Sequence, residues 1–181
     1  MSTGFVEYRF SHLLKRPLHV GGILEYRADG VLVRKVEWPY QELTEVMGDQ
    51  VHITRTGKPP RTVSLQRVPQ LRVLLDSFRA LLEGKLQPLS VDFDIALEDA
   101  AAGWKLTLTP KGAQLRKHLA YIDVFGAGDR PSCLEAVEPD GDASLTLFGP
   151  APESLAHAPL PGRAELESRC RLSATSAAAG Q

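Results

Sequence analysis

Residues 22–38, which read GILEYRADGVLVRKVEW, indicate the fold most directly. Apolar or small residues fill every second position up to Tyr26, and the alternation resumes after Asp29 and Gly30. A period of two is typical of a strand with one dry and one wet face, because successive side chains point to opposite sides. Asp-Gly is a favoured hairpin turn, since glycine tolerates a positive φ. The stretch therefore predicts two neighbouring antiparallel strands.

The same alternation continues on both sides of this hairpin, within residues 4–10, 43–65 and 91–147. A second Asp-Gly pair at residues 140 and 141 predicts another hairpin near the end of the series. Together these stretches predict about nine or ten strands. The expected fold class is mainly β (α+β), with a curved antiparallel sheet or half-barrel.

One segment departs from the strand period. Apolar residues recur at helical spacing after Pro69, and Gly84 ends the run. We expect a helix over residues 69–83 that covers the concave face of the sheet. The stripe that would face the sheet comprises Leu71, Leu74, Leu75, Phe78 and Leu82.

The overall composition disfavours several classes of partner. The chain has 181 residues with 21 Lys and Arg against 22 Asp and Glu, for a formal charge of -1. Such a balance lacks the basic footprint of a nucleic-acid-binding protein, so no nucleic-acid partner is expected. No apolar run is long enough for a bilayer-spanning helix.

No constellation of residues carries catalysis. The five histidines occur outside the spacings of known metal-binding motifs, and no metal site or cofactor is expected. His12 and Ser11 could join Asp123 in a triad, but no nucleophile elbow accompanies them. The glycines near residue 126 precede a strand and not a helix, which disfavours a phosphate loop. We expect no catalytic residues and no enzyme activity.

The two cysteines, Cys133 and Cys170, lack a CxxC partner. Residues 149–181 are rich in proline and alanine, and we expect them to form a loosely ordered C-terminal tail after a domain of residues 1–148. Because Cys133 falls in an expected strand and Cys170 in this tail, both thiols are expected to remain free.

Arg34 stands out within its strand. It shares an alternation with Leu32, Val36 and Trp38, which would place a guanidinium on an apolar face. A charge there must be paired, or the side chain must extend to water at an edge. Both interpretations stay open.

Short motifs in a fixed order carry a family resemblance. They are FVEYRF (5–10), KRPL (15–18), GILEY (22–26), VLVRKV (31–36), Pro39, the helix from Pro69, WKLTLTPK (104–111) and LEAVEPDGD (134–142). Over about residues 4–148 the chain resembles the outer-membrane lipoprotein carrier protein LolA family, and more closely its divergent LolA-like branch.

The resemblance implies a monomeric, non-enzymatic periplasmic protein with helices lying across a half-barrel as a lid. Members of the family take an acylated lipoprotein from an inner-membrane donor and pass it to an outer-membrane acceptor. The family's N-terminal helix has no counterpart before Gly4, so we expect that roughly thirty or more residues are missing or that the start was placed too late. The family's lid-latch arginine aligns with Ala28, beside Arg27, and this role does not carry over.

We therefore predict a carrier that binds acyl chains of a lipoprotein or another lipid-like cargo in an apolar concavity and carries it toward the outer membrane. The alternative is a hydrophobic-ligand sensor or membrane-partner module with the same fold. The expected cavity residues are Tyr8, Phe10, Leu24, Tyr26, Leu32, Arg34, Val36, Leu71, Leu74, Leu75, Phe78 and Leu82.

Overall fold

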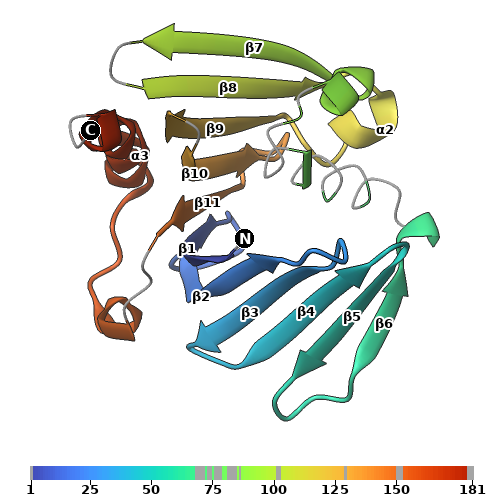
Figure 1. Ribbon diagram of the computed structural model, residues 1–181. Coiled ribbons are helices and arrows are strands. Elements are labelled where there is room, and N and C mark those ends of the chain that lie inside the picture. The colour runs from blue at the N-terminus through green and yellow to red at the C-terminus, as the bar shows by residue number, and fades with distance from the viewer. Residues whose placement is uncertain are drawn as a thin grey trace.

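The computed structural model describes residues 2–67, 72, 75, 79–80, 85, 87–100, 103–128, 130–149 and 153–178. In these residues the chain forms a single antiparallel sheet of eleven strands (Figure 1). The strands are β1 (Ser2–Phe10), β2 (Leu18–Tyr26), β3 (Leu32–Trp38), β4 (Glu42–Met47), β5 (Gln50–Arg55), β6 (Arg61–Ser64), β7 (Phe93–Ala100), β8 (Gly103–Pro110), β9 (Tyr121–Ala127), β10 (Arg130–Val137) and β11 (Ala143–Phe148).

The sheet is open and does not close into a barrel. Its strand order is β6-β5-β4-β3-β2-β1-β11-β10-β9-β8-β7, so β6 and β7 form the two edges. The first and last strands pair at its centre, with Phe5 opposite Phe148. In Figure 1 the two halves of the sheet fan apart from β1 and β11 toward these edges. The mainly β, antiparallel fold that the sequence predicts is confirmed.

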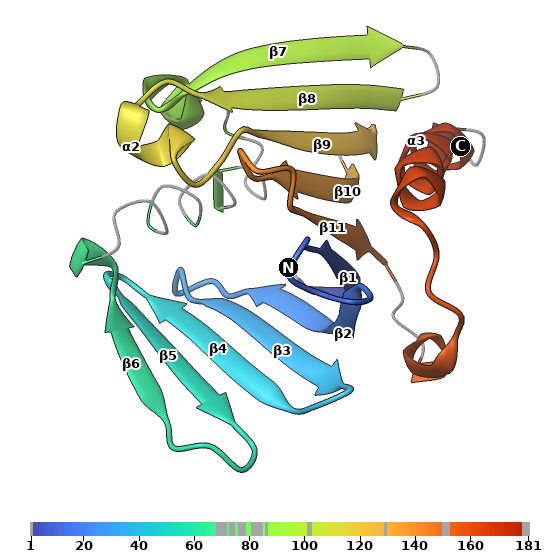
Figure 2. The same ribbon diagram turned by 180° about the vertical axis from the view of Figure 1, so that it is seen from behind.

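The helical elements lie on two different sides of the sheet. They are η1 (Leu65–Arg67), η2 (Gln87–Val91), α2 (Ala113–Arg116), η3 (Glu153–His157) and α3 (Arg163–Ala178). Leu115 of α2 belongs to a core cluster with Leu108 and Val124, whereas Leu166 of α3 packs with Val6 and Leu145. Figure 2 shows α2 and α3 far apart. We call the side of the sheet on which α2 packs the inner face, and the side on which α3 packs the outer face.

Four described residues fall in the helix expected from the sequence. Arg72, Leu75, Arg79 and Ala80 are helical, and Leu75 and Ala80 pack in inner-face clusters. The other four expected stripe residues lie outside the described residues: Leu71, Leu74, Phe78 and Leu82. Among the described helices, none combines the length and the apolar character needed to span a bilayer.

A bulge in β3 corrects the expected placement of Trp38. Gly21 pairs with Trp38 but the next residue, Gly22, pairs with Val36, so β3 has one extra residue there. An extra residue breaks the alternation. Val36 therefore packs on the inner face and Trp38 on the outer face. The Trp38 ring covers Gly21 so closely that a Cβ there would lie 2.0 Å from the ring, which explains the glycine.

The C-terminal segment differs most from expectation. Cys133 of β10 and Cys170 of α3 form a disulfide with a Cα–Cα distance of 5.4 Å, so the prediction of two free thiols is wrong. Leu166 and Cys170 are completely buried one helical turn apart. These two residues fix α3 on the outer face where the sequence predicts a loosely ordered tail. The proposed boundary at residue 148 stays a prediction.

Candidate functional site

A pocket of about 270 Å³ opens on the inner face. Strands from both halves of the sheet and the helical residue Leu75 contribute to its walls. Its lining is Phe5, Glu7, Leu24, Leu32, Arg34, Thr44, Val46, Leu75, Leu134, Ser144, Thr146 and Phe148. Apolar side chains dominate this set, which is typical of a site for a hydrophobic ligand with a few orienting polar groups.

Strand register explains why these residues meet. On β1, Phe5 and Glu7 point to the same face because they are two residues apart. Leu24 of β2 pairs with Arg34 of β3. Leu32 in turn pairs with Val46 of β4. The inner-face positions of successive strands therefore form one continuous wall.

Arg34 is paired. Its Nη2 donates to Glu7 Oε2 at 3.0 Å, and its Nη1 lies 3.9 Å from Glu42 Oε1. The guanidinium carbon also lies 4.9 Å from the centre of the Phe5 ring. The side chains of Arg34 and Glu7 are each 28% exposed. Of the two interpretations left open by the sequence, the structure shows the paired one.

The expected cavity residues divide between the two faces. Leu24, Leu32, Arg34 and Leu75 line the inner-face pocket. Tyr26 and Val36 belong to the same inner-face cluster but not to the pocket lining.

Tyr8 and Phe10 lie on the outer face with Leu166 and Cys170, so their placement on the concave face is wrong. Both faces of β1 are covered, and alternation alone does not tell which apolar set faces the cavity.

Eight residues that line the inner-face pocket were not predicted from the sequence. They are Phe5, Glu7, Thr44, Val46, Leu134, Ser144, Thr146 and Phe148. Three of these come from β11, which reaches the pocket only because it pairs with β1 at the other end of the chain. The alternation of residues 143–148 predicts a strand, but no local signal gives that pairing.

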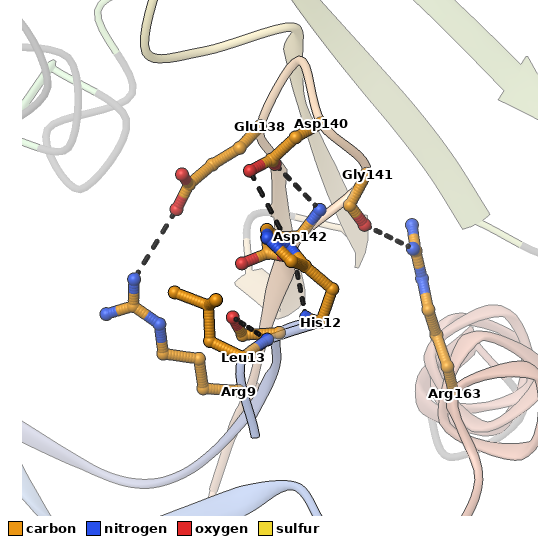
Figure 3. Close-up of polar contacts among 9 residues, drawn as sticks. Arg9, His12, Leu13, Glu138, Asp140, Gly141, Asp142 and Arg163 are labelled. Atoms are coloured by element: carbon orange, nitrogen blue, oxygen red, sulfur yellow. Dashed lines mark hydrogen bonds and ion pairs between the residues drawn. The ribbon is translucent and has the colours of Figure 1, made fainter. Parts of the chain in front are cut away.

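A polar cluster joins two loops at one end of the sheet (Figure 3). Asp142 Oδ1 accepts the backbone N–H of His12 at 2.9 Å and lies 2.8 Å from His12 Nδ1. Hydrogen bonds from Ser11 and His12 hold the pKa of Asp142 at about 2. The hydrogen bond and charge of Asp142 raise the pKa of His12.

The ligand-type atoms of His12, Asp140 and Asp142 lie within 4.8 Å of one another, a grouping that the sequence analysis did not anticipate. Their contacts fasten the β1–β2 loop to the β10–β11 turn. We call this group the loop clasp.

Charged residues are also buried beneath α3. Asp123 accepts the Thr107 hydroxyl at 2.6 Å and lies 3.1 Å from Lys105 Nζ. Glu135 accepts from Arg163 of α3 at 2.8 Å. Burial raises the pKa of Glu135, while Arg163 opposes that rise. These contacts satisfy the buried carboxylates of the outer face.

A family model described as outer membrane lipoprotein carrier protein LolA-like matches residues 1–171. A search of curated protein sequences returns no significant match.

Two solved structures illustrate the structural matches. The LolA superfamily protein NE2245 from Nitrosomonas europaea aligns over 87% of this chain and 89% of its own, at 8% identity and a TM-score of 0.38. The Pseudomonas aeruginosa MucA/MucB complex aligns over 88% of this chain and 56% of its own, at 13% identity and a TM-score of 0.34. This chain thus spans just over half of the matched chain in that complex. Because the family model extends through most of α3, both the sheet and its outer-face helix fall within one family match: the chain belongs to the outer membrane lipoprotein carrier protein LolA-like family.

Proposed function

We propose that this protein is a non-enzymatic periplasmic carrier whose inner-face pocket binds the acyl chains of a lipoprotein or another lipid-like cargo. The observation that supports this most strongly is the apolar pocket itself, with Phe5, Leu24, Leu32 and Phe148 in its walls. Each methylene of an acyl chain that leaves water contributes about 0.8 kcal/mol. The affinity of such a pocket for an acyl chain should therefore increase with the length of the chain.

The disulfide supports a periplasmic location. Cys133 and Cys170 are bonded and completely buried. Structural disulfides persist in oxidising compartments, of which the bacterial periplasm is one, and are rare in the cytosol. Family membership supports the last part of the proposal, carriage toward the outer membrane between an inner-membrane donor and an outer-membrane acceptor.

Release of cargo requires a cover that can move. Leu75 packs into the inner-face cluster, and two neighbouring helical residues are held by polar contacts. Arg72 lies 3.0 Å from Asp49, and Arg79 donates to the Gly30 carbonyl at 3.4 Å. The Arg72–Asp49 pair is exposed, and an exposed ion pair contributes typically about 0–1 kcal/mol. We expect displacement of these helical residues to load and unload the cargo.

The test is binding of a fluorescent triacylated lipopeptide to the purified protein and to two variants. Leu75→Asp places a charge against the pocket and should weaken binding at least about tenfold, since an unpaired buried charge is costly. Leu97→Asp makes the same change at a leucine that is 59% exposed and lies outside the pocket, and should bind as the parent does. Failure of the parent protein to bind, or equal binding by all three proteins, contradicts the proposal.

Transfer separates the carrier from its alternative. Cargo that moves from the loaded protein to outer-membrane acceptor proteins supports carriage. Cargo that binds but never transfers supports a hydrophobic-ligand sensor or membrane-partner module of the same fold.

A further inference from the structure

A second cavity adjoins the first on the inner face. Its volume is about 280 Å³, close to that of the first pocket. Its lining is Glu7, Arg9, Leu18, Val20, Arg34 and Tyr40. The two cavities share two residues, Glu7 and Arg34, which are the partners of the 3.0 Å ion pair.

The register places these cavities one after the other along β1. Phe5, Glu7 and Arg9 point to the inner face in succession. Phe5 lines only the first cavity and Arg9 only the second, while Glu7 lines both. Arg34 reaches Glu7 from β3, across the intervening strand β2. The ion pair therefore bridges the inner face at the point where the cavities meet.

The pair has an alternative arrangement available. Glu42 lies on the far side of Arg34, its Oε1 3.9 Å from Arg34 Nη1, and its side chain is 16% exposed. A guanidinium presents several donors in a fixed fork, so Arg34 can keep one carboxylate partner after it leaves the other. Glu7 is followed on the same face of β1 by Arg9. After separation from Glu7, Arg34 therefore keeps Glu42 beside it. Glu7 still shares the second cavity with Arg9, whose guanidinium also lies 3.5 Å from Glu138.

Resting on the proposed function, we infer that the Glu7–Arg34 pair is a gate that sets how much of an acyl chain the protein can bury. Chains short enough for the first cavity leave the pair closed. Longer chains separate Glu7 from Arg34 and pass over Val20 and Leu18 into the second cavity. Glu7 and Arg34 are in this sense the residues that determine chain-length specificity.

The experiment measures dissociation constants for a series of saturated fatty acids of increasing length. Each buried methylene should improve affinity about fourfold until the first cavity is full. Beyond that length the gain per methylene should fall in the parent protein, because the ion pair must open. In Glu7→Gln/Arg34→Met, which removes both charges, the fourfold gain should continue to longer chains.

A control removes another ion pair of β3, one that lines neither cavity. Lys35 and Glu37 form an exposed 2.8 Å pair. We call the chain length at which the gain per methylene falls the break. The variant Lys35→Met/Glu37→Gln should show this break at the same chain length as the parent. Circular dichroism and melting temperature report folding of every variant. If the double pocket variant does not fold, Glu7→Gln alone should move the break, because it weakens the same contact.

The outcomes distinguish the two proposals. If the parent binds no fatty acid of any length, the proposed function fails. If the parent binds and the break stays at one length in every folded variant, or if affinity changes equally for all chains, the proposed function stands and the gate is overturned.

Discussion

The inner and outer faces of one sheet are covered in opposite ways. On the inner face, described helical residues pack through Leu75 and are held by polar contacts such as Arg72 with Asp49. On the outer face, α3 is attached by the Cys133–Cys170 disulfide and by Arg163 with the buried Glu135. The disulfide and the buried Glu135 carboxylate therefore lie on the outer face, whereas the apolar pocket lies on the inner face.

Under the proposed function, this difference fits opening of the inner face and not of the outer face. Under the proposed function the cover of the pocket moves during cargo exchange, so a covalent bond cannot hold that cover in place. The disulfide and the Glu135–Arg163 pair therefore stabilise the outer face, and the proposed acyl-binding pocket lies on the inner face.

Removal of the disulfide should produce the largest effect on stability. Cys133→Ala/Cys170→Ala opens a link between residues 37 apart and should lower the free energy of unfolding by about 4 kcal/mol, on the loop-entropy estimate. Fatty-acid binding by the folded fraction should remain parental. Urea denaturation checks the first expectation, and thiol counting under denaturing, non-reducing conditions should find no free thiol in the parent. Two free thiols would contradict the covalent attachment of α3 to the outer face.

Loss of the Arg163 guanidinium should have the second-largest effect on the free energy of unfolding. Arg163→Met leaves Glu135 buried without its cation and should cost about 2 kcal/mol near pH 7, a value reduced for the partial exposure of Arg163. Because burial raises the pKa of Glu135, the cost of its charge is present above that pKa and disappears as the carboxyl takes up a proton. The difference from the parent should therefore shrink as the pH is lowered.

Arg169→Met is the control for that measurement. It removes a guanidinium from α3 whose partner, Glu165, is equally exposed. It should leave stability unchanged at every pH. A penalty for Arg163→Met that grows toward low pH would contradict the role given to Glu135.

Arg34→Lys should affect function more than stability. A lysine keeps the charge but has no planar fork, so it cannot contact both Glu7 and Glu42 as the guanidinium does. We expect the unfolding free energy to change by less than about 1 kcal/mol, since the pair is partly exposed. The rate of cargo release should change, which stopped-flow displacement of a fluorescent lipopeptide measures. Parental release rates would show that the fork has no part in cargo handling.

The loop clasp should give the smallest effect, and one that depends on pH. The raised pKa of His12 means that its contribution is complete below its unfolded value of about 6.5 and is lost as pH rises through the folded value. The pKa of Asp142, lowered to about 2, means that its contribution is present above its unfolded value and is lost as pH falls toward about 2. Asp142→Asn should therefore destabilise more at pH ~5 than at pH ~8. An equal loss at both values would contradict the pairing with His12.

The sequence predicts the sheet better than the contents of its two faces. Alternation and Asp-Gly turns are local signals, and they give an antiparallel β fold. The pairing of Phe5 with Phe148 is not local, and without it the inner-face role of β11 is hidden. The alternation of β1 offers Phe5 and Glu7 for one face and Tyr8 and Phe10 for the other. Only the position of α3 shows that the second set faces outward.

Two further features escaped prediction for identifiable reasons. The β3 bulge opposite Gly21 and Gly22 moves Trp38 to the other face, and a single extra residue leaves no mark in an alternating pattern. Among residues 163–171, where the side chains of α3 are described, Leu166 and Cys170 are the fully buried ones, and the α3 sequence lacks the broad apolar stripe of a packed helix. A long-range disulfide compensates for that narrow contact. Arg34 was the one site residue whose unusual setting could be recognised from alternation alone.

Photo-crosslinking with a lipopeptide that carries a diazirine in its acyl chain tests the central claim most directly, because it reports which face the chain occupies. The loaded protein is irradiated, digested and mapped by mass spectrometry. If the acyl chain binds the inner face, adducts should form on inner-face residues, foremost Leu24, Leu32 and Phe148, and none on Tyr8 or Phe10. Adducts concentrated on Tyr8, Phe10 or α3 would contradict it, since the acyl chain would then bind to the face that the disulfide keeps closed.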